Sequence, residues 1–318
     1  MPQISIITTT YKHAKFIAET IESVLNQTFT DRELLIGDDS PDNETRNIIQ
    51  TYTKKYSNKI KTRHHKPNKW IVENMNFLLS QTNPSTKYVA FLEGDDLRYP
   101  DYLTEKMKIF QKYPNVWLVY NELSLIDAEG NFLEKRRLAP RTKKWYKNET
   151  ITIGNFFSSD MICYGYSTLM SRKYNICIHN YDKSDLMGTE VDYLLQIAEN
   201  HAMYGIQKPL SSYRKHTNNT SKNLTTSISH FEFLVEKYIA MGKVDKPSIT
   251  KVKILIAMMK SVANIANKKR KNAIKNIIYC CQLSIPQTCI MGFRSLRYRM
   301  LKPTFYLLKQ KLWTKSTS

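Results

Sequence analysis

Two acidic pairs each come directly after a short apolar run. Asp38 and Asp39 follow the run Glu-Leu-Leu-Ile-Gly, and Asp95 and Asp96 follow the run Tyr-Val-Ala-Phe-Leu-Glu-Gly. Apolar runs of this length are typical of buried parallel strands, and ligands of open α/β sheets bind just beyond the carboxyl ends of such strands. We therefore expect four carboxylates at one crevice, where their mutual repulsion favours a divalent metal and a nucleotide between them.

The first 120 residues alternate between short apolar runs and segments with helical periodicity. The expected strands cover residues 3–9, 33–37, 59–64, 88–93 and 116–121, and the expected helices cover residues 14–26, 43–56, 70–79 and 100–112. This alternation predicts an α/β fold with a doubly wound, mostly parallel sheet and helices on both faces.

The pattern changes later in the chain. Residues 127–181 break into short segments typical of loops and small strands, and helical periodicity returns at residues 185–199. After a polar loop over residues 215–229, the chain is expected to be helical nearly to its end. We predict a catalytic domain over residues 1–225 and a basic helical C-terminal region over residues 226–318.

Positive charge is concentrated in the C-terminal region. The formal net charge is +20, and from Lys243 onward 17 Lys and Arg residues face a single acid, Asp245. Over residues 248–276 and 289–313 the cations mix with apolar residues, which favours an anionic membrane surface as partner. The alternative is that these apolar stripes pack on the catalytic domain or in a homodimer. Nucleic acid is not expected, because no recognisable binding module accompanies the charge.

The five cysteines predict neither a disulfide framework nor a zinc site. Their number is odd, two are adjacent, and none has metal-ligand spacing to a histidine pair. The N-terminus begins with a strand pattern instead of a signal peptide, and no apolar stretch reaches the ~18 residues of a spanning helix. We therefore expect a cytoplasmic protein that is peripheral on the inner face of the cell membrane.

Several motifs in the first 220 residues together resemble the family 2 glycosyltransferases, which have a GT-A fold. The matching stretches read ISIITTTY, SVLNQT, ELLIGDDS, FLEGDD and TEVD, and they begin at Ile4, Ser23, Glu33, Phe91 and Thr189. The resemblance implies a metal-dependent, inverting enzyme that moves a sugar from a nucleotide-diphosphate donor, commonly a uridine one, to an acceptor hydroxyl. It also implies a glycan or lipid-linked acceptor in surface polysaccharide, lipopolysaccharide or glycan assembly.

The pair Asp95 and Asp96 resembles the DxD-type metal motif of this family. The resemblance places Mn²⁺ or Mg²⁺ on Asp96 and the ribose or the metal on Asp95, while Glu93 stands in place of the usual first acid. Such a cation stabilises the charge of a departing diphosphate as a Lewis acid. The alternative is an acidic cluster at the start of a helix near Pro100.

The resemblance also assigns the donor site. Asp39 resembles the residue that accepts a hydrogen bond from the N3–H of uracil, and Thr9 with Tyr11 resembles the loop around the base and ribose. Asp38 is a second candidate for donor contact. Its alternative role is to cap the next helix.

Glu190 resembles the general base of inverting family members, which takes the proton of the acceptor hydroxyl. The family more often has Asp at this position, and Asp192 lies two residues further on, so both carboxylates are candidates. The alternative is that these acids only stabilise the positive end of a helix.

Arg214 and His216 resemble an element that closes the donor site in some relatives. His216 is a candidate metal ligand and Arg214 a candidate phosphate ligand, although a lone histidine is often structural. Many relatives carry Gly near Trp70 and Arg near Met75, so donor preference or phosphate contacts are expected to differ here.

Two other functions compete with this one. A nucleotidyltransferase shares the sheet and the paired acids, but it needs a Gly-rich loop with Lys after the first strand, and residues 8–15 contain no Gly. A non-catalytic scaffold whose basic helices bind lipid or nucleic acid predicts no binding of donor nucleotides.

Overall fold

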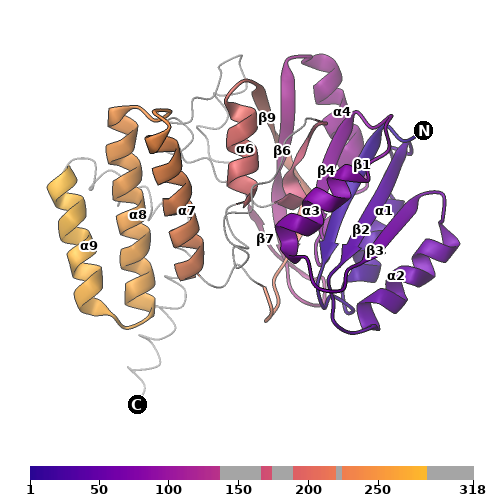
Figure 1. Ribbon diagram of the computed structural model, residues 1–318, viewed down its shortest axis with the longest axis horizontal. Coiled ribbons are helices and arrows are strands. Elements are labelled where there is room, and N and C mark those ends of the chain that lie inside the picture. Colours follow the sequence, from indigo (N-terminus) through magenta and orange to yellow (C-terminus); the bar gives the residue numbers. More distant parts are fainter. Residues whose placement is uncertain (137–165, 174–188, 220–223, 285–318) are drawn as a thin grey trace. The chain divides into compact units, whose positions relative to one another are not determined.

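The computed structural model describes residues 1–136, 166–173, 189–219 and 224–284 (Figure 1). These residues divide into two compact units. The first contains the sheet and the helices around it, and the second contains helices α7, α8 and α9. The functions predicted for the two regions are not tested by this division and stay predictions.

Four parallel strands form the first half of the sheet in the order β3-β2-β1-β4. These strands are β1 (Ile4–Thr10), β2 (Arg32–Asp38), β3 (Ile60–His64) and β4 (Tyr88–Glu93). The accompanying helices are α1 (Ile17–Leu25), α2 (Glu44–Lys55), α3 (Trp70–Ser80) and α4 (Tyr102–Lys112). Every residue of β1 and β2 is buried, which explains why central strands of this kind read as continuous apolar runs.

The second half of the sheet is mixed. It contains β5 (Leu97–Arg98), β6 (Val116–Ile126), β7 (Phe132–Arg136), β8 (Met170–Arg172) and β9 (Ala202–Arg214), and helix α6 (Thr189–Ala198) precedes β9. Strand β8 pairs antiparallel with β4 and β6, whereas β9 pairs parallel with β6 and antiparallel with β5. The predicted α/β fold class is confirmed, with the parallel pairing concentrated in the first half.

The alternation of side chains along the strands divides the helices between two faces. On one face, α1, α2 and α4 pack with Ile4, Ile6 and Ile36 in one buried core. On the other face, α3 contacts β1 and β2, and the ring of Tyr193 in α6 lies edge-on to Phe91 in β4 at 5.1 Å. The sheet therefore has helices on both faces, as predicted.

The observed elements differ from the sequence-based prediction in several places. For example, α1 begins at Ile17 and not at residue 14, and β6 extends to Ile126 and not only to residue 121. Strand β9 has no predicted counterpart, because shifts in its pairing with β6 interrupt the alternation of buried and exposed residues. Helix α7 begins at Leu224, inside the predicted polar loop. Helix α4 begins at Tyr102 after its N-cap Asp101, so Pro100 precedes the helix and does not lie in its first turn.

A buried carboxylate joins three segments at the start of the sheet. Glu33 is 4% exposed and accepts hydrogen bonds from Ser5 Oγ (2.6 Å), Lys61 Nζ (2.8 Å) and the N–H of Asn83 (2.8 Å). Burial raises the pKa of Glu33, but the bonds from Lys61, Ser5 and Asn83 outweigh burial and hold the pKa below its ordinary value. The ionised form of Glu33 therefore stabilises the folded state.

We expect Glu33→Gln to lower the free energy of unfolding at neutral pH by about 1–3 kcal/mol, because hydrogen bonds to a buried charge are lost. Since the folded pKa is depressed, the stabilisation is present above the unfolded pKa of about 4.3 and is lost as the pH falls through the folded pKa. Urea unfolding across this acid range measures the effect. A difference between wild type and variant that does not shrink in acid would contradict it.

The second unit consists of α7 (Leu224–Ala240), α8 (Lys246–Ala266) and α9 (Arg270–Leu283). Asp245 caps α8 by accepting the N–H of Ser248 at 2.9 Å. Helices α8 and α9 share a small core of Ile254, Ala257 and Cys280. Within the described ranges, no helix combines the length and the apolarity needed to cross a membrane.

Candidate active site

The end of β1 lies between the two acidic pairs. Just beyond the strands, the N–H of Asp39 donates to the C=O of Thr10 at 3.0 Å, and the N–H of Gly94 donates to the C=O of Thr9 at 3.1 Å. Because β2 and β4 are the two parallel neighbours of β1, the acids that follow them flank the same strand end. This is the edge of the sheet where the sequence predicts a ligand.

Asp95 is buried between two histidines. Its Oδ2 atom lies 2.8 Å from Nε2 of His216 and 3.8 Å from Nε2 of His13, and the carboxylate side chain is 9% exposed. Burial raises the pKa of Asp95, but the hydrogen bond from His216 and the charges of His13 and His216 outweigh burial and hold the pKa below its ordinary value. The surroundings therefore favour an ionised Asp95.

Two sets of side chains in the described part of the chain have the geometry to hold a metal ion. One set is His13, Asp95 and His216, and the other is Glu93, Asp95 and Asp96. In each set the candidate ligand atoms lie within 4.8 Å of one another. Sequence reasoning identifies Asp95, Asp96 and His216 as candidate ligands but misses His13. The one sequence feature that could have pointed to His13 is its position in the loop after β1.

Asp96 lies in a different environment from its neighbour. It is 1% exposed, and its Oδ1 accepts the backbone N–H of Arg214 at 2.9 Å. Burial and the charge of Asp95 raise the pKa of Asp96 well above its ordinary value. The pKa values of the two neighbouring carboxyls are thus shifted in opposite directions, and the metal contact assigned to Asp96 stays a prediction.

Arg214 links the end of β9 to the acidic loop. Its side chain is fully buried, and Nε donates to the C=O of Asp95 at 2.9 Å, Nη1 to the C=O of Ala128 at 3.2 Å and Nη2 to Glu19 Oε2 at 2.7 Å. All three guanidinium nitrogens therefore donate to protein groups. These contacts hold the backbone of Asp95 in place, and phosphate binding by Arg214 stays a prediction.

Asp39 is held from two sides. Its Oδ1 accepts the N–H of Lys69 at 2.9 Å, and its Oδ2 accepts Nδ2–H of Asn74 at 2.9 Å. Asn74 is fully buried, donates to the C=O of Gly37 at 3.0 Å and lies 3.2 Å from Nε2 of His65. Burial raises the pKa of Asp39, and the hydrogen bonds from Lys69 and Asn74 oppose that rise. Each oxygen keeps a second lone pair for a ligand, and sequence reasoning misses the supporting Asn74 and His65.

We expect Gly37→Ala to weaken nucleotide binding and to destabilise the fold by about 1–3 kcal/mol, the usual cost of overpacking. An added Cβ would lie 1.8 Å from Oδ1 of Asn74, so the side chain that orients Asp39 would have to move. Calorimetry with uridine diphosphate and urea unfolding measure the two effects. The double variant with Asn74→Ala should regain stability without regaining affinity, whereas an unchanged affinity in Gly37→Ala would contradict the prediction.

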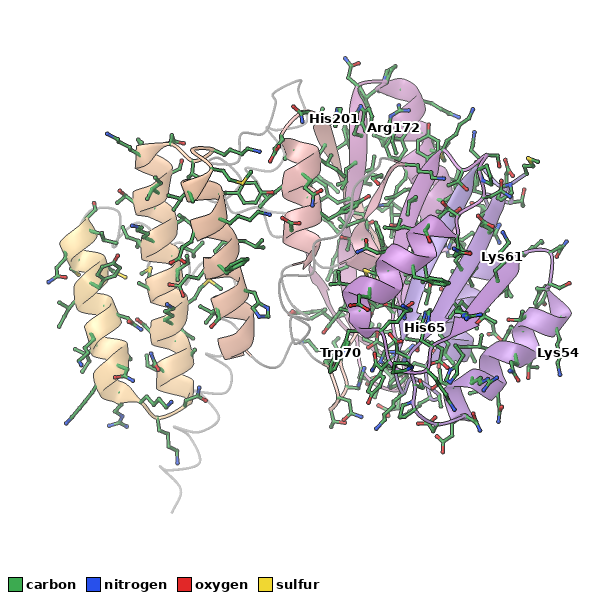
Figure 2. All side chains as sticks on the ribbon, viewed as in Figure 1. Lys54, Lys61, His65, Trp70, Arg172 and His201 are labelled. Carbon is green, nitrogen blue, oxygen red and sulfur yellow. The ribbon has the colours of Figure 1, made fainter. Side chains whose placement is uncertain are left out.

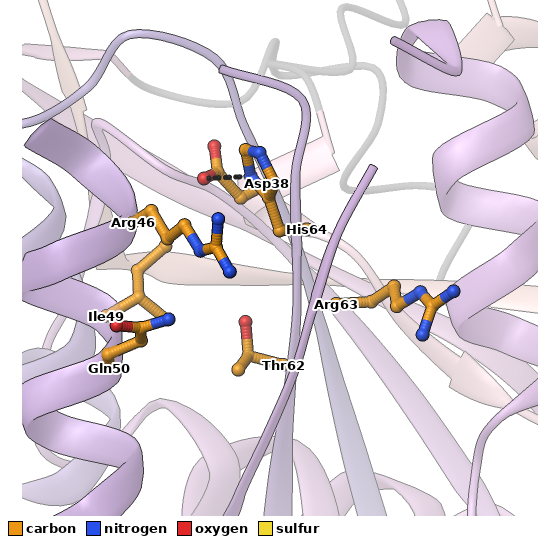
Figure 3. A pocket seen from close by; sticks show the side chains of 7 residues that line it. All are labelled: Asp38, Arg46, Ile49, Gln50, Thr62, Arg63 and His64. Atoms are coloured by element: carbon orange, nitrogen blue, oxygen red, sulfur yellow. Dashed lines mark hydrogen bonds and ion pairs between the residues drawn. The ribbon is translucent and has the colours of Figure 1, made fainter. Parts of the chain in front are cut away.

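Asp38 makes separate contacts. Its Oδ1 accepts the N–H of Ser40 at 2.9 Å, and its Oδ2 lies 2.9 Å from Nδ1 of His64. Helix α2 has Asn43 as its N-cap, so the alternative role of Asp38 as a helix cap is wrong. A pocket of about 260 Å³ opens beside this pair between α2 and β3, lined by Asp38, Arg46, Ile49, Gln50, Thr62, Arg63 and His64 (Figure 3).

The remaining donor-site candidates differ in exposure. Thr9 is 7% exposed, whereas Tyr11 is 46% exposed, and Nζ of Lys12 lies 5.4 Å from the centre of its ring. Trp70, labelled in Figure 2, is exposed at the surface. It has a φ of +63°. That left-handed backbone conformation is one that glycine adopts most readily. In this chain the N–H of Trp70 donates to Asn68 Oδ1 at 2.6 Å and fixes the turn.

Glu190 and Asp192 lie in the first turn of α6. The side chain of Glu190 lies outside the described residues. Asp192 is fully buried, and its Oδ2 accepts Nε2–H of Gln196 at 2.7 Å. Both assignments of the general base therefore stay predictions, and the contacts of Asp192 show it bonded within its own helix.

The sequence matches the model of Glycosyl transferase family 2 over residues 5–178. Among curated proteins, chondroitin synthase of Escherichia coli is 27% identical over 249 residues, which is 76% of this chain and 33% of that enzyme. The chain therefore spans about a third of the length of this relative.

Solved structures share the fold. The S. aureus TarS 1–349 complex with UDP-GlcNAc has a TM-score of 0.52 at 15% identity, covering 87% of this chain and 89% of that one. Mannosyltransferase PcManGT from Pyrobaculum calidifontis, in complex with GDP-Man and Mn²⁺, has a TM-score of 0.58 at 14% identity, covering 99% and 88%. Since the family match covers more than half of the chain and the sheet carries its acids at the expected edge, this chain belongs to Glycosyl transferase family 2 and has a GT-A fold.

Proposed function

We propose that this chain transfers a sugar from a nucleoside-diphosphate donor, with uridine diphosphate as the carrier, to an acceptor hydroxyl with inversion. The observation that carries the proposal is the position of Asp95. Its carboxylate is buried beside His13 and His216, at the end of the strand whose other flank holds Asp39. One edge of the sheet thus offers ligands for a cation and an acceptor for the N–H of a base.

Donor recognition rests on Asp39 and Tyr11. The carboxylate of Asp39 can accept the N3–H of uracil, and the exposed ring of Tyr11 offers a face for base stacking. Lys69 and Asn74 orient Asp39 before the donor arrives, which reduces the ordering cost of binding. The neighbours bound to UDP-GlcNAc and GDP-Man support a nucleotide sugar as the donor class.

The residues around Asp95 fit Mn²⁺ or Mg²⁺. Asp95 offers an ionised oxygen, His216 offers an imidazole nitrogen 2.8 Å away, and Glu93 with Asp96 offers further oxygens. When bound, the cation stabilises the negative charge that the diphosphate gains as it leaves. Arg214 holds the backbone of Asp95 in place for this contact. The Mn²⁺ complex of a structural neighbour supports a metal-dependent reaction.

Deprotonation of the acceptor is assigned to Glu190. A sugar hydroxyl is a poor nucleophile at neutral pH, so a carboxylate within hydrogen-bond reach must take its proton as the new bond forms. Glu190 lies in the first turn of α6, and Asp192 is buried and bonded to Gln196. The buried position of Asp192 supports Glu190 as the base.

The acceptor is proposed to be a glycan or a lipid-linked glycan in surface polysaccharide, lipopolysaccharide or glycan assembly. The 27% identity to chondroitin synthase over 76% of this chain supports a polysaccharide product. We propose that the reaction on such acceptors takes place on the cytoplasmic side of a membrane.

A thermal-shift panel of nucleoside diphosphates and triphosphates with Mn²⁺ tests the proposal. Binding of uridine diphosphate at 100 times its Kd should add about 2.7 kcal/mol to the free energy of unfolding. Stabilisation by triphosphates alone would favour the nucleotidyltransferase alternative. Stabilisation by no nucleotide would favour the non-catalytic scaffold.

Helix α9 supports peripheral membrane binding. Its apolar residues at helical spacing are strongly exposed: Ile274 57%, Ile277 47%, Ile278 52% and Tyr279 43%. The helix also carries Arg270, Lys271 and Lys275 and no acid, a composition that suits the surface of an anionic bilayer. A homodimer contact through the same helix is the alternative.

We expect the chain to co-sediment with vesicles that contain phosphatidylserine and to remain in solution with phosphatidylcholine alone. Replacing Ile277 and Ile278 with Glu should abolish sedimentation, because the change removes apolar area and adds repelling charge. Replacing the exposed Phe132 of β7 with Glu is the matched control and should leave sedimentation unchanged. The homodimer alternative predicts a different result. The chain would then form a dimer by light scattering, the same double change would dissociate it, and no vesicle binding would be seen.

A further inference from the structure

Two imidazole rings face the same carboxylate oxygen at the end of β1. Nε2 of His216 lies 2.8 Å and Nε2 of His13 lies 3.8 Å from Oδ2 of Asp95. The candidate ligand atoms of the three residues lie within 4.8 Å of one another. That spacing is compatible with one cation bound by all three, since ligand bonds of about 2.0–2.2 Å place neighbouring ligand atoms about 3–4 Å apart.

The position of His13 is fixed by the loop that carries it. The C=O of His13 accepts the N–H groups of Phe16 and Ile17, both at 2.9 Å, which ties the loop to the start of α1. The ring of Phe16 contacts both histidines, with ring centres 4.7 Å from His216 and 6.4 Å from His13. The two imidazoles therefore share one apolar support and stand nearly perpendicular to each other, at 82°.

The space beside His13 depends on Gly94. A Cβ at Gly94 would lie 2.7 Å from the side chain of Thr10 and 3.0 Å from Nδ1 of His13, so only glycine lets the acidic loop approach so closely. Nδ1 of His13 is buried and has no hydrogen-bond partner among the described residues. The ring nitrogen that faces the carboxylate of Asp95 is Nε2, which lies 3.8 Å from Oδ2 of Asp95.

We propose that His13 is a third protein ligand of the cation that the proposed function requires, and that the set of two imidazoles and one carboxylate makes the site selective for Mn²⁺ over Mg²⁺. The inference rests on the proposed function and specifies its metal. Mg²⁺ demands near-ideal octahedral geometry and gives up its waters reluctantly, so two imidazole ligands disfavour Mg²⁺ more than a transition metal ion such as Mn²⁺. Asp95 with Glu93 and Asp96 would instead form an all-oxygen set without this preference.

The surroundings of Asp96 favour the histidine set. The Oδ1 atom of Asp96 already accepts the backbone N–H of Arg214 at 2.9 Å, and Asp96 is 1% exposed. One oxygen of Asp96 is therefore bonded to a protein group, whereas Nε2 of His13 and Nε2 of His216 both face Oδ2 of Asp95. Three protein ligands from His13, Asp95 and His216 leave the remaining positions to diphosphate oxygens and water.

Pulsed electron paramagnetic resonance of Mn²⁺ bound to the full chain tests the inference, because it detects nitrogen nuclei coordinated to the ion. Wild type should show two coordinated nitrogens, and His13→Ala should show one. In calorimetric titrations His13→Ala should lower Mn²⁺ affinity at least ~10-fold and leave Mg²⁺ affinity, measured by competition, nearly unchanged. His201→Ala, whose ring stacks on Trp117 outside the cluster, is the matched control.

His13→Gln provides a second variant, because the amide keeps the size and polarity of the side chain and supplies an oxygen. It should also lose one nitrogen signal while its thermal unfolding stays close to wild type. Equal nitrogen signals and equal Mn²⁺ affinity in wild type and both variants would overturn the inference. If Asp95→Asn abolishes Mn²⁺ binding and neither His13 variant changes it, the proposed function stands but the role of His13 does not. If wild type binds no Mn²⁺ even with uridine diphosphate, both the role of His13 and the metal dependence in the proposed function are overturned.

Discussion

Replacing Asp95 with asparagine should abolish metal-dependent donor binding and lower turnover by at least ~100-fold, comparable to removal of a strong charge-stabilising group. Asp95 belongs to both candidate ligand sets, and its depressed pKa keeps it ionised at neutral pH. The amide keeps the shape of the side chain and removes the charge that attracts a cation. Calorimetry with uridine diphosphate, with and without Mn²⁺, measures the binding, and release of the diphosphate product measures turnover.

Two further variants make the Asp95 result specific. Asp31→Asn removes an exposed acid outside the crevice and should leave binding and turnover unchanged. Asp96→Asn separates the two assignments of the metal motif, because the resemblance places the metal on Asp96 and the contacts of Asp95 favour the histidine cluster. Retained Mn²⁺-dependent binding in Asp95→Asn, together with its loss in Asp96→Asn, would transfer the ligand role to Asp96.

Replacing Glu190 with glutamine should lower turnover by about 10²- to 10⁴-fold, the usual contribution of a positioned general base. Binding of the nucleotide and metal should stay intact, because the base acts on the acceptor and not on the donor. A fall in kcat at unchanged donor affinity is the signature of a group that acts only in the chemical step. Steady-state kinetics and calorimetry on the same preparations provide both measurements.

Asp192→Asn distinguishes the two candidate bases. Asp192 is fully buried and bonded to Gln196, so its replacement should lower thermal stability more than turnover. Glu236→Gln, which changes an exposed acid of α7, is the control for the loss of one charge. Unchanged turnover in Glu190→Gln with a strong loss in Asp192→Asn would assign the proton transfer to Asp192.

The strands and helices in the first half of the fold could be predicted because each of them leaves a pattern in residues that are close together in the sequence. Central strands β1 and β2 are buried along their whole length and read as apolar runs, and α1 places its apolar residues at helical spacing. The long strand β9 could not be predicted, since its pairing partner β6 lies about 80 residues earlier and shifts register along the way. Local patterns contain no information about such a distant partner.

The amino-acid sequence by itself determined the order of strands and helices in the first 120 residues apart from the short strand β5, the acids that follow β2 and β4, and the resemblance to family 2 glycosyltransferases. Only the tertiary structure decided which side chains meet at that edge of the sheet. Arg214 and His216 reach Asp95 because β9 returns to pair with β5, and His13 joins them because the loop after β1 is tied to α1. Strand and helix signals come from short-range periodicity, whereas a site of this kind comes from contacts between residues more than 80 positions apart, which folding alone brings together.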